Sequence, residues 1–245
     1  MESYSPILII DDEESNVAYL KRYLEKIGRD INEAPTCDDP LHSPHFYVES
    51  SADADEALNF MREQMNKGEN LGAIISDNHL GRGDIDSYDV NGDDFLRIIR
   101  GRPAYCLNRR DEDAGEPINE ISSFDELFDL YGGRDSAIGQ YLSEKFDDNF
   151  EDYKAFCRYW SGERNKSPLL ILFCGHPSEA HLDGIEEEVT VVHKSYDLEG
   201  VTCERVILGA LMQGGALPKE ITEKLIALEG RLREGAPARR RTYRP

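Results

Sequence analysis

Short apolar runs recur along this chain and end in polar or charged residues. They occupy 6–10, 46–48, 73–76, 169–173 and 189–192. Runs of this length, bounded by turn residues, are typical of buried strands. Between several of them apolar residues recur at helical spacing, as Val17, Leu20 and Leu24 do. Strands that alternate with helices predict a parallel α/β sheet covered on both faces.

The helical segments follow from apolar spacing and from end signals. We expect helices at 13–28 with Gly28 as the stop, at 53–67 with an Asp53/Glu56 capping box, at 92–100, at 198–212 and at 218–232. Three more helical patterns, at 124–131, 136–146 and 149–160, form an aromatic-rich insertion between the third helix and the fourth strand. Short helices need tertiary packing, so we expect these aromatic residues in a core rather than on an exposed docking surface.

Right-handed crossovers leave few topologies for five parallel strands. We expect a flavodoxin-like (βα)5 doubly wound sheet with strand order 2-1-3-4-5, which puts the first and third strands side by side. In this organisation the sheet domain comprises residues 1–100 and 168–213, and the helical insertion comprises 101–167. Residues 214–245 carry a C-terminal helix and a basic tail, whose arginine run at 239–244 is typical of disorder rather than function.

Charged residues follow three of the predicted strands. Asp11 and Asp12 follow the first strand, Asp77 follows the third and Lys194 follows the fifth. The carboxyl ends of parallel strands meet at the edge where open α/β sheets bind their ligands, so we expect these side chains to converge. Carboxylates brought together repel one another, and a hard divalent cation such as Mg²⁺ relieves this repulsion.

This arrangement resembles the receiver domain of two-component response regulators. The resemblance rests on the acids and the lysine in this order, and on Asn91-Gly92-Asp93-Asp94 at the start of the third helix. It covers about 1–100 and 167–213. It implies that Asp77 accepts a phosphoryl group and that Lys194 contacts the phosphoryl oxygens. The Mg²⁺ ligands that it implies are Asp11, Asp12, Asp77 and the main-chain carbonyl of His79.

The resemblance also implies partners and a mode of action. The phosphoryl donor would be a histidine kinase or a histidine phosphotransfer protein, and output would come from contacts with an unidentified downstream protein. The chain would then be a phosphoacceptor signalling protein and not an enzyme. Two positions depart from the family pattern. Cys174 stands where receivers carry the Ser or Thr switch residue, and Val191 replaces the switch aromatic.

Three other functions remain open from the sequence. The changes at Cys174 and Val191 favour a degenerate receiver that acts as a phosphorylation-independent adaptor. The acids at Asp11–Glu14 are partly compatible with a metal-dependent phosphatase of the haloacid-dehalogenase type, although no threonine follows them. His79 and His176 follow neighbouring strands and could join the acids in a transition-metal site.

Composition restricts the setting and the partners. A net charge of −21 and a pI near 4.6 argue against nucleic acid as the main partner. No apolar run is long enough for a membrane span, and five cysteines without a C-x-x-C pair are typical of a reduced cytoplasmic protein. We expect the acidic segment 81–90 to be a mobile lid rather than a calcium loop, and Cys37, His42 and His45 to lie in a surface loop rather than a zinc site.

Overall fold

In the computed structural model of this chain, the described residues are 6–32, 48–80, 90–102, 118, 121–162, 167–176, 180, 182, 184–194, 197–198, 201–217, 219 and 221–227. Most of the predicted lid (81–89), the loop that contains Cys37, His42 and His45, and the basic run at 239–244 lie outside these residues.

A five-stranded parallel sheet forms the centre of the molecule, in the order β2-β1-β3-β4-β5. Its strands are β1 (Ile7–Ile10), β2 (Val48–Ser51), β3 (Ala73–Ser76), β4 (Leu169–Cys174) and β5 (Val189–His193). The register pairs Ile10 with both Ser51 and Ser76, so the carboxyl ends of the three central strands are level. The flavodoxin-like strand order predicted from the sequence is confirmed.

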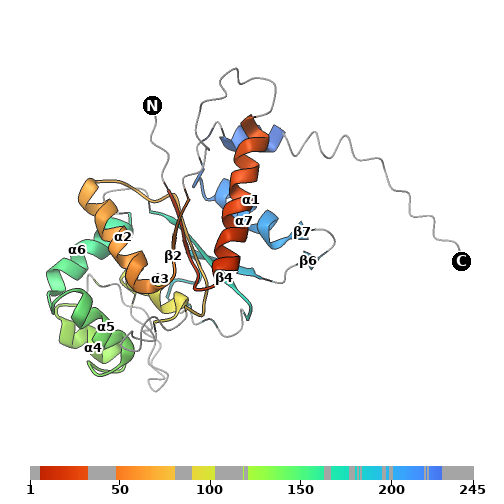
Figure 1. Cartoon of the computed structure of the whole chain (residues 1–245). Helices are drawn as coiled ribbons and strands as arrows, with labels where there is room; N and C mark the ends of the chain where they lie inside the picture. Colours follow the sequence, from red (N-terminus) through yellow and green to blue (C-terminus); the bar gives the residue numbers. More distant parts are fainter. Residues whose placement is uncertain are drawn as a thin grey trace, which may run out of the picture.

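Helices cover both faces of the sheet (Figure 1). Helices α1 (Glu14–Asn32) and α7 (Cys203–Gln213) lie on one face, and α2 (Ala54–Lys67) and α3 (Gly92–Arg100) lie on the other. Successive strand residues point to opposite faces, so each strand serves two cores. Ile7 and Ile9 pack in the core beneath α1 and α7, whereas Leu8 and Ile10 pack in the core beneath α2 and α3.

The insertion between α3 and β4 folds as three helices, as predicted. They are α4 (Phe124–Leu130), α5 (Ala137–Lys145) and α6 (Phe150–Trp160). Their N-cap side chains are Ser123, Ser136 and Asn149, each of which accepts a hydrogen bond from a main-chain N–H in the first turn. Figure 1 places this layer beyond α2 and α3, on the side away from α1.

The aromatic residues of the insertion are core residues, as predicted. Those that are fully buried are Tyr131, Tyr141, Phe146, Tyr153, Phe156 and Trp160, while Phe150 and Tyr159 are partly buried against the same core. Their polar ends bind the sheet domain: the Tyr141 hydroxyl donates to the Ala54 carbonyl at 3.2 Å, and the Tyr153 hydroxyl donates to the Ile98 carbonyl at 3.1 Å. The insertion therefore shares one core with α2 and α3.

Several sequence-based boundaries are wrong. Helix α1 continues through Gly28 to Asn32, because one glycine costs a helix only about 1 kcal/mol. The second strand begins at Val48 rather than at 46. The helix expected from 198 begins at Cys203, since a small antiparallel pair, β6 (Asp197–Leu198) and β7 (Val201–Thr202), precedes it.

Two further features concern the (βα)5 pattern and the C-terminal region. The described residues between β4 and β5, namely 175, 176, 180, 182 and 184–188, form turns and no helix, so the fourth strand–helix unit of the (βα)5 pattern is shortened. The predicted C-terminal helix is present at 221–227, where Ile221 and Leu225 join the core beneath α1 and α7.

Candidate functional site

Three carboxylates converge at the carboxyl edge of the sheet. Asp11 follows β1 directly, Asp12 is next to it, and Asp77 follows β3 on the neighbouring strand. One carboxylate oxygen of each lies within 4.8 Å of the other two. Asp11 and Asp77 are buried, whereas Asp12 is exposed. The predicted convergence of the acids is therefore present, with one of the three carboxylates open to solvent.

Asp11 is held by donors from the start of α1. Its Oδ1 accepts from the main-chain N–H of Glu13 at 2.9 Å. The side-chain amide of Asn16 lies 3.1 Å from both carboxylate oxygens. Sequence reasoning missed Asn16; the signal available was its place in the first turn of the helix that follows the acid pair. These bonds orient Asp11 before any ligand arrives.

Asp77 is fixed from both sides. Its main-chain N–H donates to the Ile10 carbonyl at 2.7 Å, and its Oδ1 accepts from the Asn78 N–H at 2.7 Å. Its Oδ2 lies 2.8 Å from Lys194 Nζ. Burial raises the pKa of Asp77 above its ordinary value, and the opposing hydrogen bond and charge of Lys194 reduce this effect without cancelling it. A cation at this site would stabilise the carboxylate form.

Lys194 joins the two buried acids. Its Nζ is 3.1 Å from Asp11 Oδ2 and 2.8 Å from Asp77 Oδ2. Burial by itself lowers the pKa of this ammonium group, but the hydrogen bond to Asp77 and the charges of both acids outweigh burial and raise it. The lysine is therefore a charged counter-ion in the absence of a ligand, and its flexible stem allows it to move toward another anion nearby.

Cys174 ends β4 beside this cluster. Its side chain is buried, and its main-chain carbonyl accepts from the Lys194 N–H at 2.8 Å. Burial raises the pKa of the thiol, and the charge of Asp77 raises it further. The thiol therefore stays protonated at neutral pH and is a weak hydrogen-bond donor. Val191, at the position of the switch aromatic, lies on β5 with an exposed side chain.

The histidines lie outside the acid cluster. His79 and His176 both have exposed side chains. Within the described ranges, the residues placed closely enough to share a metal ion are Asp11, Asp12 and Asp77, without either histidine. This geometry does not support the transition-metal alternative. The role of the His79 carbonyl remains a prediction.

The donor set suits a hard cation. All three groups are carboxylates, two of them are buried and pre-oriented, and no sulfur or imidazole is among them. Mg²⁺ prefers oxygen ligands and keeps several waters, so an exposed third acid is compatible with it. Among the described helices, none is long and apolar enough to cross a membrane.

Comparison with known proteins gives distant likenesses. No protein-family model matches the chain, and no curated protein matches it. Among solved structures, the signal receiver domain of an HD-domain-containing protein from Pseudomonas fluorescens Pf-5 is similar, with 14% identity, coverage of 86% of this chain and 94% of that one, and a TM-score of 0.39.

A response regulator receiver domain protein from Clostridium thermocellum is also similar, with 14% identity, coverage of 91% and 98%, and a TM-score of 0.38. Similarity at this level does not establish family membership. The fold assignment rests on the strand order and the parallel register of this chain.

Proposed function

We propose that this chain is an atypical response regulator that accepts a phosphoryl group on Asp77 and signals through protein contacts. The observation that carries the proposal is the arrangement of Asp11, Asp12 and Asp77 within 4.8 Å of one another, with Lys194 bonded to two of them. Aspartyl phosphorylation requires a positioned carboxylate nucleophile, a cation site and a mobile positive side chain. The cluster supplies a candidate for each.

Each residue has a stated task in this proposal. An Asp77 carboxylate oxygen attacks the phosphorus atom, and the bond from phosphorus to the donor's leaving group breaks with its electron pair on that group. Asp11, Asp12, Asp77 and the His79 carbonyl would hold Mg²⁺, which would neutralise charge on the phosphoryl oxygens. Lys194 would leave Asp77 and pair with a phosphoryl oxygen. Cys174 would lie in the position of the Ser/Thr switch residue.

The biological setting follows the same proposal. The donor would be a histidine kinase or a histidine phosphotransfer protein, and the output partner would be another protein. The free thiols of Cys157, Cys174 and Cys203 are compatible with the cytoplasm. A chain with this role would be a phosphoacceptor rather than an enzyme that turns over a separate substrate.

The test is phosphoryl incorporation from a small phosphodonor. Incubation with acetyl phosphate and Mg²⁺ should add the mass of one phosphoryl group, and both EDTA and Asp77→Asn should abolish the addition. Asp125→Asn, which removes an exposed acid of α4, is the matched control and should leave incorporation unchanged.

The second candidate is a phosphorylation-independent adaptor, favoured by the buried thiol of Cys174 and the exposed Val191. If wild-type protein takes up no phosphoryl group under conditions that support Mg²⁺ binding, the adaptor function replaces the leading proposal. A beryllofluoride titration followed by amide NMR extends the test, because shifts that reach α4–α6 would identify the output surface.

A further inference from the structure

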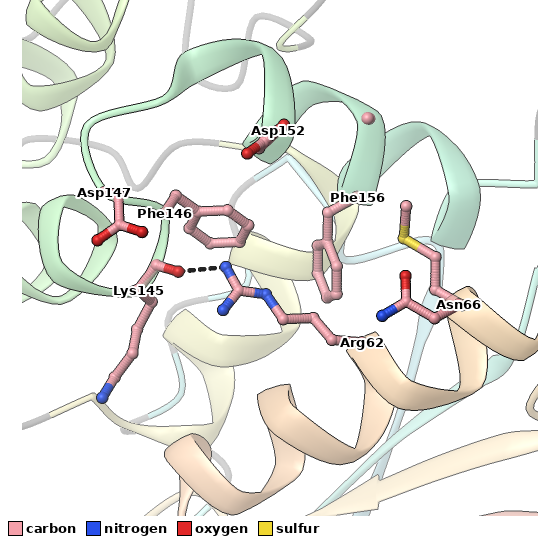
Figure 2. Close-up of a pocket in the computed structure, with 9 residues that line it drawn as sticks. Arg62, Asn66, Lys145, Phe146, Asp147, Asp152 and Phe156 are labelled. Atoms are coloured by element: carbon pink, nitrogen blue, oxygen red, sulfur yellow. Dashed lines mark hydrogen bonds between the residues drawn. The ribbon is translucent and has the colours of Figure 1, made fainter.

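A second polar hollow lies away from the acid cluster. It has a volume of about 400 Å³ and lies where α2 meets the α5–α6 turn and α6 (Figure 2). Its lining residues are Arg62, Met65 and Asn66 of α2, with Lys145, Phe146, Asp147, Asp152, Ala155 and Phe156 of the insertion. A volume of this order suits a small ligand.

The positive group of the hollow is Arg62. Its Cζ lies 4.3 Å from the centroid of the Phe146 ring, and one of its Nη atoms donates to the Lys145 carbonyl (Figure 2). A guanidinium group has five N–H donors, so this single bond leaves further donors for a ligand. Lys145 contributes less, because its Nζ is already paired with Asp55 at 2.6 Å and Glu144 at 3.0 Å.

The negative groups are Asp147 and Asp152. Both are exposed, and neither makes an ion pair within the described part of the chain. Burial lowers the pKa of Arg62, while the charges of Tyr141, Asp147 and Asp152 act in the opposite direction. The two carboxylates are therefore close enough to act on the guanidinium electrostatically, but neither is within ion-pair distance of it.

The remaining lining supplies amide and apolar groups. The Asn66 side chain is exposed on the α2 wall, where its amide offers both donors and an acceptor. The rings of Phe146 and Phe156 are almost fully buried, and Met65 adds a flexible apolar wall. A cation and two anions thus flank an apolar floor without contacting each other.

We propose that this hollow binds a free α-amino acid with an apolar side chain. The ligand carboxylate accepts hydrogen bonds from Arg62 and Asn66, and its ammonium group pairs with Asp147 and Asp152. Its side chain packs on Phe146 and Phe156. An α-amino acid carries opposite charges joined through one carbon, which matches a cation and carboxylates separated by more than ion-pair distance. Occupancy would bridge α2 and α6, and it does not depend on the chemistry of Asp77.

The ligand series that tests the proposal uses the full-length protein and isothermal titration calorimetry. L-Leucine, L-methionine and L-phenylalanine are the probes, with N-acetyl-L-leucine and L-leucinamide as analogues that each lack one charge. At least one probe should bind saturably, and each analogue should bind at least about tenfold more weakly than L-leucine, because a lost charge-assisted hydrogen bond costs more than 1.4 kcal/mol. Absence of saturable binding by all three probes, or equal binding of the analogues, overturns the proposal.

The protein variants provide a second measurement. Asp147 has a φ of 48°, so Asp147→Asn keeps a residue that tolerates left-handed backbone. Asp147→Asn and Asp152→Asn should each weaken binding several-fold. Glu151→Gln makes the same charge change beside Asp152 but outside this hollow, so it should have no effect. Asp77→Asn should also bind normally, which separates this proposal from the phosphoacceptor function. Equal losses in Glu151→Gln and Asp152→Asn would contradict the site.

Discussion

The α-carbon of Gly92 lies directly against the main-chain carbonyl of Asp77. A Cβ atom built on Gly92 would lie 1.7 Å from the Asp77 carbonyl oxygen and 2.6 Å from Ser76 Oγ. The Gly92 N–H also donates to the Asn78 carbonyl at 2.8 Å. Helix α3 therefore begins in contact with the loop that carries the proposed phosphoacceptor, and only glycine permits this approach.

Gly92→Ala should displace Asp77 and destabilise the protein. The added methyl group meets main-chain atoms, which cannot rotate away, so we expect a loss of at least about 2 kcal/mol in the free energy of unfolding and impaired phosphoryl uptake. Urea unfolding and the acetyl phosphate assay measure the two effects. Gly209→Ala in α7 is the control, because a Cβ there has no neighbour within 4 Å and alanine favours a helix. Equal stability of the two variants would contradict the contact.

Asp77→Asn should be at least as stable as the wild type in the absence of divalent cations near neutral pH. Burial raises the pKa of Asp77 despite Lys194, so the charged carboxylate is disfavoured in the folded state. A neutral amide removes this cost, and Lys194 keeps its contact with Asp11. Thermal unfolding in EDTA checks this. A lower melting temperature for Asp77→Asn would mean that its ion pair with Lys194 outweighs burial.

Lys194→Met should bind Mg²⁺ more tightly than the wild type. The ammonium group occupies the space between Asp11 and Asp77, and it repels a divalent cation placed beside them. Even with the dielectric constant of water, a +1 charge about 6 Å from a +2 charge costs about 1.4 kcal/mol, or tenfold in affinity. Calorimetric Mg²⁺ titration measures this, with Lys67→Met on α2 as the control. Weaker binding by Lys194→Met would indicate that the lysine organises the acids.

Two buried arginines of α3 should respond oppositely to replacement by methionine. Arg100 donates to the carbonyls of Trp160 at 2.6 Å and Pro168 at 2.8 Å, and its Nε is 3.0 Å from Glu188 Oε2. Arg97 makes one long contact with Asp94 at 3.4 Å, while its Nε and Nη2 have no hydrogen-bond partner.

Arg100→Met should therefore cost about 3 kcal/mol, because two carbonyls and a carboxylate lose their partner. Arg97→Met should change stability by less than about 1 kcal/mol, because the lost contact is weak and the desolvation cost disappears. Urea denaturation of both variants decides the matter. A loss in Arg97→Met as large as that in Arg100→Met would show that unsatisfied buried charge is not the controlling factor.

Three buried tyrosines should make stability fall steeply at alkaline pH. Burial raises the pKa of Tyr131, Tyr141 and Tyr153 above 10, and each hydroxyl donates to a main-chain carbonyl. The unfolded chain then releases these protons first, so their contribution is complete below about pH 10 and is lost as pH rises above it.

Urea unfolding at several pH values above 9, with tyrosinate absorbance in parallel, measures this slope. Tyr141→Phe should reduce the slope by the equivalent of one proton, about 1.4 kcal/mol per pH unit. Tyr159→Phe is the control, because its hydroxyl donates to the Glu69 carbonyl in a solvent-exposed bond. An unchanged slope in Tyr141→Phe would show that this phenol ionises in the folded state.

The sequence by itself determined the strand set, the strand order and the three acids of the site. These features are local: an apolar run followed by Asp11 or Asp77 is readable within a few residues, and the right-handed crossover rule converts the run order into a topology. Helix N-caps such as Ser123 are equally local, because the cap and its N–H partner lie three residues apart.

Tertiary structure alone decided how the site is wired and where some elements end. The pairing of Lys194 with Asp11 and Asp77, the close approach of Gly92 to Asp77 and the hollow around Arg62 each join residues far apart in the chain. The continuation of α1 through Gly28 also escaped the sequence, since a local helix penalty near 1 kcal/mol is smaller than the stabilisation available from the rest of a helix. Contacts of this kind depend on packing geometry, which no residue pattern encodes on its own.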